Sequence, residues 1–220
     1  YLKKIVTTWG VPAERIAVIY NGFDVPMIQE KKEDVREKLG MRGHIIVSVG
    51  RLVPWKGFVE LMEMMPTLLQ KIPDANLFII GDGPYRGLLE EKIKLLALPD
   101  RVKLVGKLSQ EELFAYLKAA DVFVLNTSYE GFSHQLLEVM ALGTPVITTA
   151  VGGNVEIIEN KKNGILLPLH DTQSFVEAII SLYSDRALVQ ALTLSAETRV
   201  KEFSDERMLK QLSYELAWMA

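Results

Sequence analysis

The chain has 220 residues, of which 49% are hydrophobic, so it can bury a sizeable core, and its formal net charge is −3. That charge provides no basic field for a nucleic-acid backbone, and we expect no nucleic-acid partner. The sequence contains no cysteine, which excludes disulfides, thiolate metal sites and a cysteine nucleophile. No apolar run approaches the ~18 residues that a membrane-spanning helix needs, so we expect a soluble, cytoplasmic protein.

The first residues suggest a domain taken from a longer protein. Position 1 is Tyr1 rather than Met, and residues 2–6 resemble the end of a helix that enters from preceding sequence. A Gly-Val-Pro break follows at 10–12, and the apolar run at 16–19 predicts a strand. The polar stretch Gln29–Lys38 predicts a solvated helix.

From residue 45 onward, short apolar runs alternate with helical segments. The predicted strands are 45–49, 77–80, 102–105, 122–125, 145–148 and 164–167. The predicted helices are 57–72, 85–97, one after 109, one from about 134, and the chain beyond 171. Parallel strands require such crossovers, so the pattern favours an α/β fold: a doubly wound parallel sheet of about six strands with helices on both faces.

Several residues mark the ends of these helices. Ser109 with Glu three positions later forms a capping-box pattern. Asp171, Asp185 and Ser204 are candidate N-caps, because their side chains accept hydrogen bonds from free backbone N–H groups. Pro66 falls inside a predicted helix, which we expect it to bend.

Glycines and charged residues follow most of the predicted strands. These strand ends carry Gly50-Arg51, Gly81-Asp82-Gly83, Gly106, Glu130-Gly131 and Gly152-Gly153. In a doubly wound sheet, ligands bind outside the carboxyl ends of the strands. We therefore predict a ligand site at this edge.

Arg51 and Lys56 lie directly after the first strand of the alternation. Arginine offers a planar fork to phosphate oxygens and lysine a point charge, so together they suit a diphosphate. In isolation, such residues are more often solvated surface cations. Their position at the predicted ligand edge favours the diphosphate.

Glu130 and Glu138 flank the start of the helix predicted from about 134. They could form a hydrolytic pair of carboxylates, or each could simply complement the helix dipole. The loop between them favours a ligand instead, because the N–H groups of Gly131, Phe132 and Ser133 can meet a phosphate at a helix N-terminus.

The remaining patterns are less specific. The turn at 81–84 is by composition more typical of a turn without function, and Gly152-Gly153 suits either a packing turn or a ligand loop. The three histidines lack metal-ligand spacing, and no Asp-x-Asp pair is present to hold a divalent cation, so we expect no metal. The dinucleotide fingerprint is also absent, which argues against a dehydrogenase.

Taken together, the motifs are similar to those of a known family. They are Gly50-Arg51-Leu52 with Lys56-Gly57, Gly81-Asp82-Gly83-Pro84, Val105-Gly106, Glu130-Gly131-Phe132 with Glu138, Gly143-Thr144-Pro145-Val146, and Gly152-Gly153. In order and spacing, they resemble the C-terminal half of GT-B glycosyltransferases of family 4 (glycosyl transferases group 1), from about residue 16 to the end. The resemblance implies a Rossmann-like donor-binding domain at 16–203. Residues 1–15 would then be an interdomain segment, and 204–220 a helix that packs on a missing N-terminal domain.

This resemblance implies a retaining transferase. It would move a hexosyl unit from a nucleotide-diphosphate sugar to a glycan, lipid or small-molecule acceptor held by the missing half, with no metal or other cofactor. The isolated domain would be inactive, and any peripheral association with the cytoplasmic membrane face would act through that missing half.

The family's functional residues map onto defined positions here. Arg51 and Lys56 would hold the diphosphate and stabilise the leaving group, and Glu130 would orient the sugar, which makes these three the catalytic candidates. The donor-binding candidates are Gly50, Gly81, Asp82, Val105, Gly106, Leu108, Gly131, Phe132, Ser133 and Glu138, with Glu138 at the ribose. The departing phosphate would help to deprotonate the acceptor, so the resemblance weakens the hydrolytic interpretation of the two glutamates.

Two departures from the family pattern bear on the donor. Asn126 stands where proline is frequent, and Ser133-His134-Gln135 replaces small or apolar residues, so both leave the identity of the sugar open. The rival interpretation is a non-catalytic nucleotide-sugar-binding or interaction module. A sugar phosphorylase or epimerase on the same architecture would require a different loop after strand 122–125.

Overall fold

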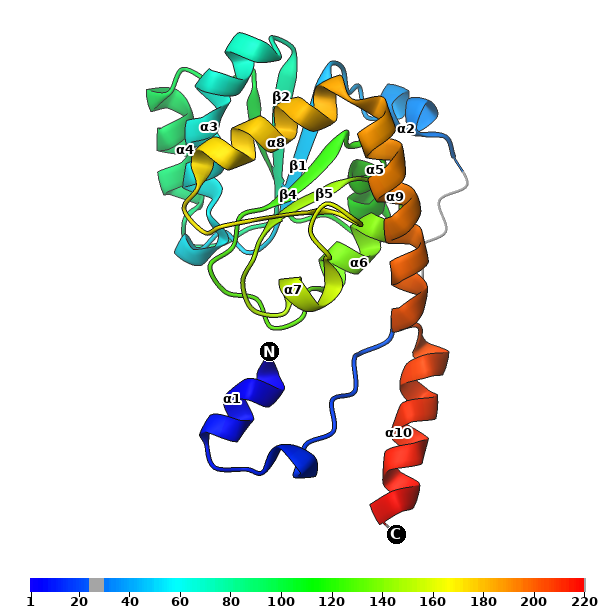
Figure 1. Ribbon diagram of the computed structural model, residues 1–220. Helices are drawn as coiled ribbons and strands as arrows, with labels where there is room; N and C mark the ends of the chain where they lie inside the picture. Colours follow the sequence, from blue (N-terminus) through cyan, green and yellow to red (C-terminus); the bar gives the residue numbers. More distant parts are fainter. Residues whose placement is uncertain (24–29, 220) are drawn as a thin grey trace.

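Figure 1 shows the fold in a computed structural model, which describes residues 1–23 and 30–219. A six-stranded sheet has the order β3-β2-β1-β4-β5-β6, and every neighbouring pair is parallel. The strands are β1 (His44–Val49), β2 (Ala75–Ile80), β3 (Val102–Gly106), β4 (Val122–Leu125), β5 (Val146–Thr149) and β6 (Ile165–Leu167). The predicted α/β class and parallel sheet are confirmed.

The centre of the sheet explains the near-continuous apolar runs in the sequence. All six residues of β1 are buried, and β1 pairs with β2 over its whole length, from His44 opposite Ala75 to Val49 opposite Ile80. A parallel strand covered on both faces has no solvent side, so it shows little alternation of polar and apolar residues.

Helices cover both faces of the sheet (Figure 1). One face carries α3 (Phe58–Lys71), α4 (Arg86–Leu95) and α8 (Thr172–Ser184), and the other carries α2 (Lys32–Lys38), α5 (Gln110–Ala119), α6 (His134–Ala141) and α9 (Arg186–Val200). Each layer has its own apolar core. Met62, Met65 and Phe175 are buried in the first core, and Phe123 and Leu137 are buried in the second.

The predicted helix caps are present. Ser109 and Glu112 form the full capping box at α5, since each side chain accepts from the other's backbone N–H. Asp171 and Asp185 cap α8 and α9, and the Ser204 hydroxyl accepts from the third residue of the final helix. Pro66 lies inside α3 on its solvent side. The bend expected there stays a prediction.

The strand predicted at 16–19 is wrong. The chain begins with α1 (Leu2–Thr8) and the short helix η1 (Ala13–Arg15), and the following residues are extended without forming a strand. Their carbonyls accept from side chains instead of a neighbouring strand, with Lys3 Nζ on Ile16 at 2.7 Å and Gln211 Nε2 on Val18 at 2.9 Å. The helix predicted from Gln29 begins at Lys32, and Gln29 itself lies outside the described residues.

The two ends of the chain project from the sheet-and-helix body (Figure 1). After η3 (Lys201–Phe203), the helix α10 (Asp205–Met219) runs away from it and exposes Leu209, Leu212 and Leu216. In the described part of the chain, every helix is too short or too polar to cross a membrane.

Candidate functional site

The candidate site lies where the strand order reverses. Successive strands run outward from β1 to β3 on one side and from β4 to β6 on the other, so the loops after β1 and β4 diverge at the point where doubly wound sheets form their ligand crevice. Lys56 lies in the first loop and Glu130 in the second. Lys56 Nζ donates to Glu130 Oε2 at 2.7 Å, and the two side chains are only 16% and 19% exposed. Two residues singled out in the sequence therefore form one partly buried ion pair.

The backbone around Lys56 is tightly held. Lys56 ends the short helix η2 (Pro54–Lys56), and Gly57 then adopts the left-handed conformation with φ +62°. A Cβ at Gly57 would overlap the Asn126 carbonyl at the end of β4. Only glycine fits both the conformation and the close approach, so the start of α3 packs directly against the loop that leads to Glu130.

The loop at Glu130 rests on the glycine turn after β5. The Gly153 N–H donates to the Glu130 carbonyl at 3.0 Å, and a Cβ on Gly152 or Gly153 would overlap the carbonyl of Glu130 or Gly131, respectively. The two glycines therefore form a packing turn beneath the candidate loop. At Gly131 itself, an added Cβ would meet no atom within 4 Å, so this stretch of backbone is open to a ligand.

A cavity of about 520 Å³ opens beside this crevice. Its lining residues are Val49, Gly50, Arg51, Gly81, Asp82, Gly83 and Lys107. The ends of β1, β2 and β3 thus meet around one space, as the strand-end argument predicts. Arg51 and Lys107 contribute positive charge there, and Asp82 contributes the opposing carboxylate, which accepts from the Gly83 N–H at 2.8 Å.

Lys107 belongs to the turn at 105–108 that the family resemblance assigns to the base of the donor, but it is not among the cations predicted to bind the diphosphate. It follows Gly106 directly at the end of a strand on the ligand edge. Charged residues directly after a parallel strand lie at the ligand edge, and this holds for Lys107 after β3 as it does for Arg51 after β1. The signal was therefore present in the sequence.

Gly81, Val105, Gly106 and Leu108 shape this end of the sheet. Gly81 has φ +129°, a Cβ there would overlap the Gly50 carbonyl, and its N–H donates to the Gly106 carbonyl at 2.8 Å. The side chains of Val105 and Leu108 pack against the second core. Both side chains are only partly buried, so Val105 and Leu108 stay candidate ligand contacts together with the backbone of this turn.

The start of α6 carries three further candidates from the sequence. The Ser133 hydroxyl is the N-cap and accepts from the Leu136 N–H at 3.4 Å. Glu138 lies about one turn into the helix and is half-buried, and this burial raises the pKa of its carboxyl. Neither Ser133 nor Glu138 lines the cavity at Arg51. Phe132 and Gly131 instead border a second space.

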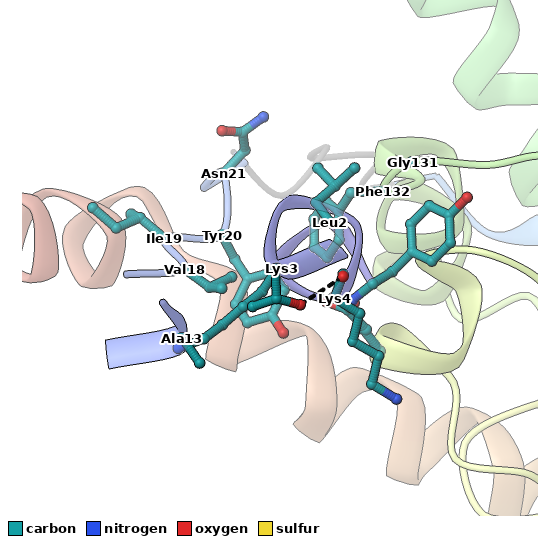
Figure 2. Close-up of a pocket in the computed structure, with 13 residues that line it drawn as sticks. Leu2, Lys3, Lys4, Ala13, Val18, Ile19, Tyr20, Asn21, Gly131 and Phe132 are labelled. Atoms are coloured by element: carbon teal, nitrogen blue, oxygen red, sulfur yellow. Dashed lines mark hydrogen bonds and ion pairs between the residues drawn. The ribbon is translucent and has the colours of Figure 1, made fainter. Parts of the chain in front are cut away.

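This second cavity, of about 550 Å³, separates the N-terminal segment from the Glu130 loop. Figure 2 shows Leu2, Lys3 and Lys4 of α1 and the segment around Tyr20 together with Gly131 and Phe132. The ring of Tyr20 lies 5.2 Å from that of Phe132, measured between centroids. The N-terminal segment therefore contacts the loop that carries the candidate site.

Positive side chains are the groups that can neutralise an anion at this edge. Within residues 1–23 and 30–219, no group of three or more histidine, cysteine, aspartate or glutamate side chains is placed to hold a metal ion. Arg51, Lys56 and Lys107 provide three cations against Asp82 and Glu130. These five groups leave an excess of one positive charge, so the arrangement suits an anionic ligand.

Comparison with known proteins identifies relatives of this chain. The family model "Glycosyl transferases group 1" matches residues 29–199. An uncharacterized glycosyltransferase of Methanocaldococcus jannaschii is 32% identical over 91% of this chain and 53% of its own length. A UDP-Gal:alpha-D-GlcNAc-diphosphoundecaprenol alpha-1,3-galactosyltransferase of Escherichia coli is 32% identical over 79% of this chain and 46% of its own.

The fold is also found in solved structures. The crystal structure of Anabaena HepE in complex with UDP matches with a TM-score of 0.89 and 25% identity, over 98% of this chain and 61% of that one. The chain spans about half the length of the curated relatives it matches, at 53% and 46% of the two described above.

Proposed function

The chain belongs to the glycosyl transferases group 1 family, and from this premise we propose that it is the donor-binding domain of a retaining glycosyltransferase. The full-length protein would move a hexosyl unit from a nucleotide-diphosphate sugar to a glycan, lipid or small-molecule acceptor. The observation that carries this proposal is the Lys56–Glu130 pair at the reversal of strand order, beside the Arg51 cavity. The E. coli relative, named for a UDP-galactose donor, and the UDP complex of HepE support this donor class.

The cations explain how the donor's diphosphate is held. Arg51 offers a planar fork to two phosphate oxygens, and Lys56 adds a point charge in a partly buried position. As the bond to the sugar breaks, negative charge builds up on the leaving diphosphate. Fixed positive groups in a crevice stabilise that charge by several kcal/mol, which is a common origin of rate enhancement.

The loop from Glu130 to Glu138 is proposed to bind the rest of the donor. Glu130 and the backbone of Gly131, Phe132 and Ser133 would orient the sugar and its distal phosphate, and Glu138 would accept hydrogen bonds from the ribose hydroxyls. A fixed position for the sugar lowers the entropic part of the barrier.

The proposed reaction would use these positions as follows. The bond between the anomeric carbon and the phosphate oxygen breaks, and a bond to the acceptor oxygen forms on the same face of the sugar. The acceptor proton passes to the leaving phosphate oxygen, and the products are the glycosylated acceptor and the nucleoside diphosphate. No enzyme nucleophile is needed for this route.

We propose further that no metal or other cofactor takes part, because side-chain cations supply the charge. The acceptor would be held by an N-terminal half, without which this domain would be inactive. A cytoplasmic location is proposed for the full-length protein, with any contact to the membrane face made by that half.

Donor binding is tested by thermal denaturation with UDP, GDP and ADP. We expect one of them to raise the melting temperature, and we expect Lys56→Ala to abolish the shift. Lys92→Ala is the matched control, because Lys92 also forms an ion pair, with Glu63, and its side chain is 22% exposed on the outer helices. The absence of a shift with all three nucleotides would refute the site.

Catalysis is tested on the full-length protein with the best donor. Turnover separates an enzyme from a non-catalytic binding module, and the anomeric configuration of the product, read by NMR, tests retention. If the transferase activity survives EDTA, the metal-independent route is supported. If EDTA abolishes the activity and added Mg²⁺ restores it, that route is refuted.

A further inference from the structure

The two carbonyls that flank Lys56 are both held by the loop that leads to Glu130. The Trp55 carbonyl accepts from the Ser128 N–H at 2.8 Å and from Thr127 Oγ1 at 3.1 Å. On the other side of Lys56, the Gly57 carbonyl accepts from Asn126 Nδ2 at 3.2 Å. Consecutive residues of one strand-end loop therefore hold the backbone on both sides of Lys56.

The hydroxyl of Thr127 occupies the central position of this arrangement. It lies 3.1 Å from the carbonyl of Trp55, which precedes Lys56, and 2.8 Å from the carbonyl of Tyr129, which precedes Glu130. A single hydroxyl thus bridges the backbone next to both members of the ion pair. It donates one hydrogen, which the two carbonyls share, and it can accept from the Tyr129 N–H at 3.4 Å.

These polar side chains lie in the interior. Asn126 is 5% exposed and Thr127 is fully buried, at the end of a strand whose preceding residues are all apolar. Burying a polar group costs free energy unless it is hydrogen-bonded. The Thr127 carbonyl is bonded in turn by the Thr149 hydroxyl, which ties the loop to the end of β5.

We infer that Asn126 and Thr127 are positioning residues that hold Lys56 and Glu130 in register across the crevice. A lysine ammonium on a four-carbon chain is mobile unless its backbone and its counter-ion are both fixed. The Thr127 hydroxyl fixes the backbone of both residues, and Asn126 fixes the residue after Lys56. The consequence for donor binding rests on the proposed function of this site.

The test compares buried threonines in the full-length protein. Thr127→Val keeps the shape of the side chain and removes the hydroxyl, and Thr127→Ser restores it. Thr144→Val is the matched control, because the Thr144 hydroxyl is also buried and donates to a backbone carbonyl, that of Leu117, at 2.8 Å. Asn126→Ala provides a second variant should Thr127→Val fail to fold.

The first readout needs no nucleotide: it is the rate at which an acetylating reagent modifies Lys56, measured by mass spectrometry. We expect several-fold faster modification in Thr127→Val than in the wild type, Thr127→Ser or Thr144→Val. The second readout is the affinity for UDP, expected to weaken about tenfold in Thr127→Val, as the loss of one buried hydrogen bond would cause.

The two readouts separate the two proposals. Unchanged Lys56 modification in a folded Thr127→Val or Asn126→Ala variant would overturn the positioning role. If Lys56 modification responds as expected but the wild type binds no nucleoside diphosphate, the positioning role holds and the proposed function is refuted.

Discussion

Lys56 and Glu130 lie 74 positions apart in the chain, and their charged groups meet at 2.7 Å. They meet because each follows a strand on one side of the point where the strand order reverses. Both side chains are largely covered, so their attraction is less screened by water than that of a surface pair. The pair thus joins the loops after β1 and β4 and places two charged groups at the site.

Replacing Glu130 with Gln should affect both stability and catalysis. The variant leaves the partly buried Lys56 ammonium without its counter-ion, which we expect to lower the free energy of unfolding by about 1–3 kcal/mol. If Glu130 orients the sugar, kcat of the full-length enzyme should fall by about 10²–10³. Denaturant titration and steady-state kinetics measure the two effects.

The control for this variant is Glu159→Gln. Glu159 forms an ion pair with Lys162 at the same 2.7 Å, but both side chains are largely exposed. Exposed pairs contribute little, so its effect on unfolding should be much smaller. Equal losses in the two variants would show that burial adds nothing to the pair at the crevice.

Gly153→Ala should displace the Glu130 loop. The new methyl group would overlap the Gly131 carbonyl, and a backbone atom cannot move aside as a flexible side chain can. We expect a loss of about 1–3 kcal/mol of stability, the range for overpacking, together with weaker UDP binding. Calorimetric unfolding and UDP titration measure these losses.

Gly87→Ala is the matched control. Gly87 lies in α4, and a Cβ there would meet no atom within 4 Å. Alanine restricts the unfolded chain, so the variant should be more stable by about 0.4–1 kcal/mol, with unchanged UDP binding. Undiminished UDP binding by Gly153→Ala would contradict the supporting role of the glycine turn.

The sheet and the main charged residues of the site were predictable from the sequence. Buried β-branched runs separated by helical segments define a parallel sheet, and the carboxyl ends of parallel strands lie at one edge. That rule places Arg51, Lys56 and Glu130 at the same edge from the sequence alone, and the structure brings Lys56 and Glu130 into contact.

The remaining features depend on contacts between distant segments. The run at 16–19 has strand composition, but pairing depends on a neighbour that the composition does not reveal. Gly152-Gly153 suited a packing turn or a ligand loop, and the close approach of the Glu130 and Gly131 carbonyls identifies the packing turn. From the sequence, Asn126 is only a departure from the frequent proline, because its bond to the Gly57 carbonyl spans 69 positions.

Stability should depend on pH through His44. Burial lowers the pKa of its imidazole, although the Asp121 carboxylate, 3.5 Å from Nδ1, opposes this shift. Histidine in an unfolded chain has a pKa of about 6.5, so below that pH the unfolded state binds more protons than the folded state. The free energy of unfolding should therefore decrease as the pH falls from about 7 to about 5.

Urea titrations at several pH values measure this dependence. His44→Gln removes the buried imidazole and should flatten the dependence in that range, while His134 and His170 remain in both proteins. An equal slope in the variant and the wild type would assign the effect to other groups.

Glu138 should make donor affinity depend on pH. Burial raises the pKa of its carboxyl above the ordinary glutamate value of about 4.3. The ionised form offers two charged acceptor oxygens to the two ribose hydroxyls, whereas protonation turns one of them into a donor and weakens the other as an acceptor. The affinity for UDP-glucose should therefore fall as the pH is lowered from 7 towards that raised pKa. UDP-glucose is the suitable probe because its esterified diphosphate does not titrate in this range.

Isothermal titration calorimetry of the wild type and Glu138→Gln measures this effect. The variant should bind UDP-glucose about tenfold more weakly at pH 7, as expected when a charged acceptor is lost, and it should lose the dependence on pH. Glu177→Gln, a change on the exposed side of α8, is the control and should match the wild type throughout. If Glu138→Gln retains the wild-type affinity at pH 7, the carboxylate does not meet the ribose, and its burial in α6 has a structural role alone.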